Sequence, residues 1–190
     1  MSQRIDAHFF FPRVPVAVVS LQDVDEALLM RSILEHLGAA ADLYQIGTPT
    51  DFMLVLEQIS PPPYLLICGH GTEQGWAFGE YGDNVDTSLL TGTALPASAL
   101  VGRVRLPGCT IISTACLSGS PEMTAAMLSG GAAAYLAPDD YPDEADTGLL
   151  ITTLFHGLLQ RDPPLEAAYR RAVATDRELA MFKLHLPPLR

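Results

Sequence analysis

Residues 64–71 read Tyr-Leu-Leu-Ile-Cys-Gly-His-Gly, and residues 109–116 read Cys-Thr-Ile-Ile-Ser-Thr-Ala-Cys. Each stretch is a short apolar run that leads to a side chain with acid/base or nucleophilic chemistry, His70 in the first and Cys116 in the second. Apolar runs of this length predict strands that are buried on both faces of a parallel sheet. Reactive groups collect at the carboxyl edge of such a sheet, so both side chains are predicted to lie there.

Working outward, strands alternate with helices along the rest of the chain. Further strands are predicted over 16–21, 41–46 and 132–136. Helices are predicted after caps at Asp23 or Asp25, at Thr48 or Thr50, and at Ser120, and two more over 146–160 and 164–182. This order predicts an α/β fold, a three-layer α/β/α sandwich with a mostly parallel central sheet. We expect strand order 2-1-3-4 with a fifth strand beyond.

The predicted organisation is a single domain over 1–190, with an N-terminal head over 1–13. Residues 75–92 change in character, because three aromatic residues alternate with glycines and a Gly-Asp-Asn turn. We interpret this segment as a hairpin insertion after His70. Its aromatic residues are predicted to form a small core or, alternatively, a wall that contacts substrate: Trp76, Phe78 and Tyr81.

The overall charge excludes several classes of partner. The chain of 190 residues carries 22 Asp and Glu against 11 Lys and Arg, a net charge of −11. Such a surface repels phosphate backbones and anionic lipid, so neither nucleic acid nor a membrane is predicted as a partner, whereas a basic peptide would be attracted. Apolar runs are too short for a membrane span, and the N-terminus lacks a signal pattern, which predicts a cytoplasmic protein.

The cysteines indicate chemistry instead of cross-linking. There are three, Cys68, Cys109 and Cys116, without a CxxC pair, so no disulfide framework, zinc site or other metal or cofactor is predicted. Cys68 and Cys109 fall within or at the start of apolar strands and are predicted to be core residues.

His70 and Cys116 have the features of a base and a nucleophile. Neighbouring strands run about 4.8 Å apart, which lets an imidazole and a thiol at two strand ends face each other. The N–H groups of Gly71 and Cys116 are candidate donors to a developing oxyanion. A helix N-terminus after Cys116 and the nearby imidazole are expected to lower the pKa of the thiol.

These segments resemble a known family. Leu65-Leu-Ile-Cys-Gly-His-Gly71 and Ile112-Ser-Thr-Ala-Cys-Leu-Ser-Gly119 are similar to the His-Gly and Ala-Cys blocks of the caspase-like (clan CD) cysteine peptidases, most of all to the CHAT domain branch. Segments 128–136, 143–156 and 166–172 are similar to later blocks of that family, in the same order. The resemblance therefore covers about 64–172.

The resemblance implies a caspase-like fold and a cysteine endopeptidase activity. His70 would be the general acid/base and Cys116 the nucleophile of an acyl-enzyme route without a metal. In related enzymes an aspartate after the fifth strand selects Arg or Lys before the scissile bond, and the matching candidates are Asp139, Asp140 and Asp143. Many relatives continue into a further strand and pocket wall, so a partner protein or second subunit is one way in which the pocket would be completed.

Two other functions stay open at this point. One is a caspase-like binding or scaffold module without turnover, and the other is a nucleotide- or flavin-binding α/β domain, although no phosphate-loop motif is present. The acidic segment 139–146 is open to three interpretations: a solvated loop, a pocket for a basic residue, or a calcium site.

Overall fold

The computed structural model describes residues 13–161 and 163–188, and its centre is a six-stranded sheet. The strands, in spatial order, are β2 (Ala40–Ile46), β1 (Pro15–Leu21), β3 (Tyr64–Gly69), β7 (Thr110–Ser113), β8 (Ala134–Pro138) and β9 (Phe182–His185). All neighbours are parallel except β8 and β9, which are antiparallel. The predicted order is confirmed, with β7 as the fourth strand and β8 as the fifth. The predicted head lies almost wholly outside the described residues.

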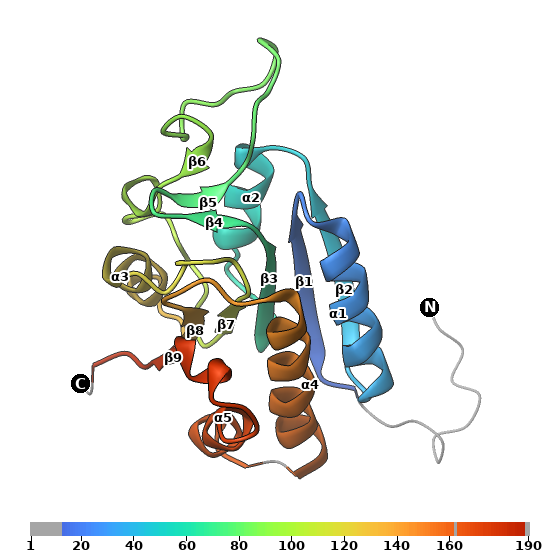
Figure 1. Ribbon diagram of the computed structural model, residues 1–190. Coiled ribbons are helices and arrows are strands. Elements are labelled where there is room, and N and C mark those ends of the chain that lie inside the picture. The colour runs from blue at the N-terminus through green and yellow to red at the C-terminus, as the bar shows by residue number, and fades with distance from the viewer. Residues whose placement is uncertain (1–12, 162, 189–190) are drawn as a thin grey trace.

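Helices cover both faces of this sheet and form the three predicted layers (Figure 1). One face packs against α1 (Val24–His36), α4 (Glu144–Arg161) and α5 (Leu165–Val173). The other packs against α2 (Pro49–Leu56), α3 (Pro121–Ser129) and the second, smaller sheet. The central strands are buried almost completely because they face a layer on each side, which explains their continuous apolar sequence.

Three helices begin at side-chain caps. Asp23, Thr48 and Ser120 each accept a hydrogen bond from the backbone N–H three residues later. Pro follows directly after Thr48 and Ser120, at a position where a helix needs no N–H donor. For the two helices whose start was ambiguous, Asp23 and Thr48 are thus the caps.

The segment after His70 forms a three-stranded antiparallel sheet: β4 (Gly71–Thr72), β5 (Gly75–Ala77) and β6 (Ala94–Leu95). The hairpin turn is therefore at 73–74, and most of 75–92 is the loop between β5 and β6, which projects at the top of Figure 1. A short helical turn, η2 (Ala97–Ala99), follows. Trp76 and Phe78 are buried against Phe52 of α2, at ring distances of 5.2 and 5.9 Å, so they form the core of this unit.

The chain departs from prediction after residue 173. A helix over 164–182 was expected, but α5 ends at Val173, and η3 (Glu178–Met181) leads into β9. The strand pairs with β8 and buries Phe182, while the three residues after it stay partly exposed. β9 is therefore a further strand that was not predicted from the sequence.

Within the described ranges, no helix is both long and apolar enough to cross a membrane.

Candidate active site

His70 and Cys116 follow the carboxyl ends of two neighbouring parallel strands. Ile67 of β3 pairs with Ser113 of β7, and each candidate lies three residues beyond its member of that pair. The backbones meet directly after the strands: a Cβ atom placed on Gly71 would lie 1.9 Å from the carbonyl oxygen of Cys116. Only glycine lets these two segments approach so closely.

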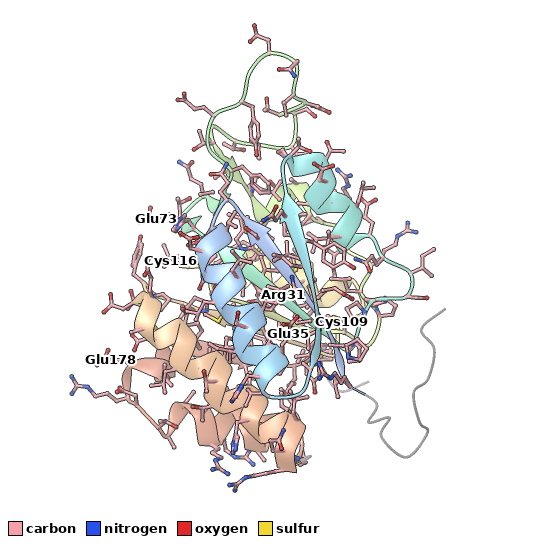
Figure 2. All side chains as sticks on the ribbon, turned by 90° about the vertical axis from the view of Figure 1, so that its right-hand side faces the viewer. Arg31, Glu35, Glu73, Cys109, Cys116 and Glu178 are labelled. Atoms are coloured by element: carbon pink, nitrogen blue, oxygen red, sulfur yellow. The ribbon has the colours of Figure 1, made fainter. Side chains whose placement is uncertain are left out.

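Exposure distinguishes Cys116 from the other two cysteines. Cys68 and Cys109 are fully buried, and burial raises the pKa of Cys109 to about 12 and that of Cys68 well above its usual range. Cys116 is partly exposed. It follows the carboxyl end of β7, whereas Cys109 precedes the amino end, and Figure 2 shows the two residues well apart. Cys116 is thus the thiol that a substrate can reach.

The pKa of Cys116 is raised, not lowered as expected from the sequence. Burial is the largest cause, and the negative charges of Glu26 and Asp140 add to it, while the residue's own backbone N–H acts in the opposite direction. A neutral thiol is therefore the resting form, and its proton must be removed before it can attack a substrate.

His70 is mostly exposed and lies beside a carboxylate. Its side chain is 70% exposed, and Nε2 is 3.7 Å from Oδ2 of Asp23. A carboxylate beside an imidazole can hold the ring in one orientation. Asp23 also caps α1 through its other oxygen, which accepts from Glu26 N–H at 3.0 Å.

A largely buried carboxylate, Glu26, lies in the same corner. Thr114 Oγ1, next to Ala115 and Cys116 in the chain, donates to Glu26 Oε2 at 3.0 Å. Burial raises the pKa of Glu26, while hydrogen bonds from Thr114, Thr147 and the Gly69 backbone partly offset this effect. Glu26 therefore connects α1 with the segment just before His70 and with the segment just before Cys116.

A cavity of about 310 Å³ opens between the N-terminal ends of α1 and α4. Its lining carries four carboxylates and otherwise two apolar side chains and a threonine. The lining residues are Asp23, Asp25, Glu26, Leu29, Met30, Glu144 and Thr147. We call this cavity the acidic pocket. Two of its residues also act on the candidate dyad: Asp23 lies beside His70, and the charge of Glu26 contributes to raising the pKa of Cys116.

A second groove of about 310 Å³ lies on the opposite face of the sheet. It is bounded by the β4–β5 turn, by η2 and by the start of α3, and Leu117 lines it directly after Cys116. The candidate dyad thus lies between two hollows, one on each side of the sheet edge.

The structure separates the three predicted specificity residues. Asp140 acts on the Cys116 thiol, and its carbonyl accepts from Leu117 N–H at 3.1 Å. Asp139 lies 3.8 Å from Lys183 Nζ on β9. Asp143 precedes α4, where its carbonyl accepts from the N–H groups of Asp146 and Thr147.

The sequence reasoning missed Glu26 and the acidic pocket. The available signal was the pattern Asp23-x-x-Glu26, which is typical of a helix start with reciprocal capping. Among the residues that the structure describes, no group of three or more His, Cys, Asp or Glu side chains could hold a metal ion.

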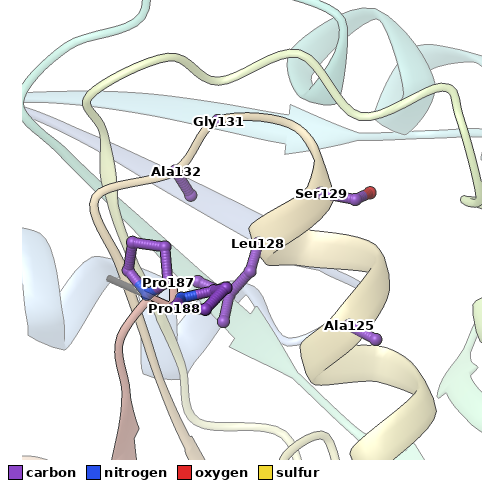
Figure 3. A pocket seen from close by; sticks show the side chains of 7 residues that line it. All are labelled: Ala125, Leu128, Ser129, Gly131, Ala132, Pro187 and Pro188. Atoms are coloured by element: carbon purple, nitrogen blue, oxygen red, sulfur yellow. The ribbon is translucent and has the colours of Figure 1, made fainter. Parts of the chain in front are cut away.

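The largest of the described hollows lies elsewhere. It has a volume of about 590 Å³ and lies between the end of α3 and the C-terminal segment (Figure 3). Its lining contains no titratable side chain: Ala125, Leu128, Ser129, Gly131, Ala132, Pro187 and Pro188. It therefore supplies neither a nucleophile nor a base.

Solved structures of other proteins have a similar fold. The chain is similar to a structure of the pro- and mature domains of Porphyromonas gingivalis RgpB, with a TM-score of 0.54 and 12% identity, over 89% of this chain and 45% of that one. It is also similar to the Saccharomyces cerevisiae separase–securin complex, with a TM-score of 0.53 and 11% identity, over 92% of this chain and 12% of that one. The chain thus spans less than half the length of either. Neither a protein-family model nor a curated protein sequence matches it. With its mostly parallel sheet in the order described, the chain has a caspase-like α/β/α fold.

Proposed function

We propose that this protein is a cysteine endopeptidase of the caspase-like class, and within it of the CHAT branch, with Cys116 as nucleophile and His70 as general acid/base. The observation that carries the proposal is the contact between the Gly71 and Cys116 backbones at the ends of β3 and β7. It brings the residue after His70 against the backbone of Cys116, which carries the one partly exposed thiol of the described chain.

The proposed reaction uses only side chains and backbone groups of this edge. His70 takes the proton from the neutral Cys116 thiol as Sγ bonds to the substrate carbonyl carbon. The N–H groups of Gly71 and Cys116 stabilise the resulting oxyanion. The imidazolium gives its proton to the leaving amine as the C–N bond breaks, and a water molecule activated by His70 then hydrolyses the thioester and restores the thiol.

The acidic pocket supports a preference for Arg or Lys before the scissile bond. Four carboxylates around a cavity of about 310 Å³ match a long cationic side chain in charge, and Leu29 and Met30 can pack against its methylene groups. Asp140 remains in the proposed set because it acts on Cys116. Asp139 and Asp143 are weaker candidates, since one lies beside Lys183 and the other precedes α4.

Protein partners are proposed as well. The similar RgpB structure contains a pro-domain together with the mature domain, and the separase structure contains securin, so each is a complex with a further polypeptide. A pro-segment, partner protein or second subunit that completes the substrate pocket is the corresponding proposal here. We retain the cytoplasm as the proposed location, which suits the three free thiols.

A second candidate is a binding module without turnover. Two observations favour it: the ring of His70 is 70% exposed beside Asp23, and the pKa of Cys116 is raised. Both describe a dyad that is not engaged in the absence of substrate.

An active-site titration distinguishes the two candidates. A peptidyl electrophile that ends in arginine should label the wild-type protein at Cys116, whereas Cys116→Ala should remain unlabelled. The matched control is Cys109→Ala, which removes a buried thiol at the other end of β7 and should leave labelling intact. An equivalent electrophile that ends in aspartate should react much more slowly. Equal labelling of wild type and Cys116→Ala would exclude the peptidase.

A further inference from the structure

Two buried hydroxyl groups flank the candidate nucleophile. Ser113 is 0% exposed and Ser118 is 3% exposed, so both hydroxyls lose their contact with water when the chain folds. A buried hydroxyl costs free energy unless its hydrogen-bonding groups are satisfied. Their partners therefore define how this part of the chain is held.

The hydrogen bonds of Ser113 can be assigned from its chemistry. Its oxygen accepts from Trp76 Nε1–H at 3.4 Å and from Ala115 N–H at 3.3 Å. The oxygen of Ser118 lies 2.8 Å from that of Ser113 and 2.6 Å from Ala115 O. Each hydroxyl has one proton, so Ser118 donates to the carbonyl and Ser113 donates to Ser118. Every group of Ser113 is then satisfied.

This network connects the two halves of the dyad. Trp76 lies on β5, where it pairs with Gly71, and the neighbouring N–H of Ala77 donates to His70 O at 3.0 Å. Ser113 thus receives one hydrogen bond from the small sheet that holds the His70 backbone and another from the N–H that precedes Cys116. Its hydroxyl therefore bridges the segment that contains His70 and the segment that contains Cys116.

The network also holds a strained residue. Leu117, directly after Cys116, has a φ of 56°, a conformation that costs free energy for a branched side chain. Such a conformation persists only where the surrounding structure fixes it. Here Tyr135 of β8 donates from its hydroxyl to Ser118 O at 2.7 Å, and Ser118 N–H donates to Ala115 O at 3.2 Å.

We propose that Ser113 is a positioning residue that, together with Trp76, Ser118 and Tyr135, fixes the Cys116 thiol relative to His70. The inference rests on the proposed function, because it concerns the same reaction. None of the four residues is assigned a contact with substrate. They act instead by setting the distance and angle between the Cys116 thiol, the His70 ring that takes its proton, and the substrate carbonyl that the sulfur attacks.

A double-mutant cycle tests this role. Trp76→Phe keeps an aromatic ring in the core and removes the indole N–H, and Ser113→Ala removes the acceptor. Each single variant should lower kcat by about 10- to 100-fold and leave KM within about twofold, because misplacement affects the transition state more than binding. The combined loss should be close to the larger single loss, well short of the product of the two.

Ser129→Ala is the matched control. It removes a serine hydroxyl that donates to Ala126 O at 2.8 Å, near the C-terminal end of α3, and it should leave kcat unchanged. Thermal melting checks that each protein is folded before its kinetics are compared, and Tyr135→Phe provides a further deletion at the edge of the network.

The outcomes separate the two proposals. An active wild-type protein whose folded Trp76→Phe, Ser113→Ala and Tyr135→Phe variants all match Ser129→Ala in kcat would overturn the positioning role alone. Multiplicative losses in the double variant would overturn the bridge between Trp76 and Ser113. A wild-type protein without turnover and without labelling at Cys116 would overturn the proposed function and this inference with it.

Discussion

Replacing Gly71 with alanine tests the central contact of the site. The new Cβ would lie 1.9 Å from Cys116 O, 2.9 Å from its carbonyl carbon and 3.1 Å from its nitrogen. All three are backbone atoms, which cannot rotate away as a side chain does. The two segments must therefore move apart.

The size of this movement sets the expected loss. Bringing the shortest contact only to 3.0 Å, the limit for real Cβ contacts, requires a shift of about 1.1 Å between Gly71 and Cys116. A misplacement of about 1 Å costs on the order of 100-fold in rate, or about 2.7 kcal/mol in the barrier. Overpacking costs about 1–3 kcal/mol of stability, which corresponds to a fall in Tm of roughly 2–12 °C in a chain of this size.

The Gly71→Ala variant is compared with the wild type in peptide cleavage and in Cys116 alkylation, and Gly148→Ala is the control. We expect kcat/KM on an Arg-ending peptide to fall at least about 100-fold, and the rate of Cys116 alkylation to change even without substrate. Gly148→Ala, in α4 with nothing within 4 Å of the added Cβ, should keep full activity and gain up to about 1 kcal/mol in stability. A folded Gly71→Ala protein with wild-type kcat/KM and alkylation rate would refute the geometric argument.

Three further perturbations probe the charges around the site. Asp140→Asn removes a negative charge that raises the pKa of Cys116, so the pH profile of alkylation should shift to lower pH, whereas Asp143→Asn should leave it unchanged. Burial raises the pKa of Glu26 above 4.5. The free energy of unfolding that this group contributes is therefore present at low pH and is lost as the pH rises through the folded-state pKa. Glu26→Gln cannot titrate, so it should flatten the fall in Tm above about pH 4.5. Asp23→Ala removes the cap of α1 and should cost about 1 kcal/mol, seen as a Tm lower by roughly 2–4 °C, and it should also reduce the preference for Arg-ending over Ala-ending peptides. An unchanged profile, slope or preference in the respective assay would contradict each of these expectations.

Most of the fold could be predicted because local patterns and packing agree. The four inner strands of the central sheet, β1, β3, β7 and β8, are mostly apolar runs, and the caps at Asp23, Thr48 and Ser120 mark helix starts that the structure confirms. β9 escaped prediction because it has only four residues, and the segment before it has a helix-like composition that forms only one short turn. Too few residues alternate there for a period to be visible.

The site was predicted only in part, because much of it depends on tertiary contacts. The positions of His70 and Cys116 at strand ends follow from the sequence. The acidic pocket does not, since the N-terminal ends of α1 and α4, some 120 residues apart in the chain, meet only in the folded protein. The raised pKa of Cys116 has the same origin: burial and two carboxylates from distant segments outweigh the local influences that were expected to lower it.

The antiparallel direction of β9 has a mechanical consequence. Because β9 runs antiparallel to β8, it starts beside the end of β8, and Met181, just before β9, accepts a hydrogen bond from Asp139 N–H at 3.0 Å. The next residue, Asp140, accepts a hydrogen bond from the N–H of Leu117, directly after Cys116. A short series of backbone hydrogen bonds therefore links the start of β9 to the residue after Cys116. Separating β9 from β8 would remove the Asp139–Met181 link, so the position of the backbone next to Cys116 depends in part on β9.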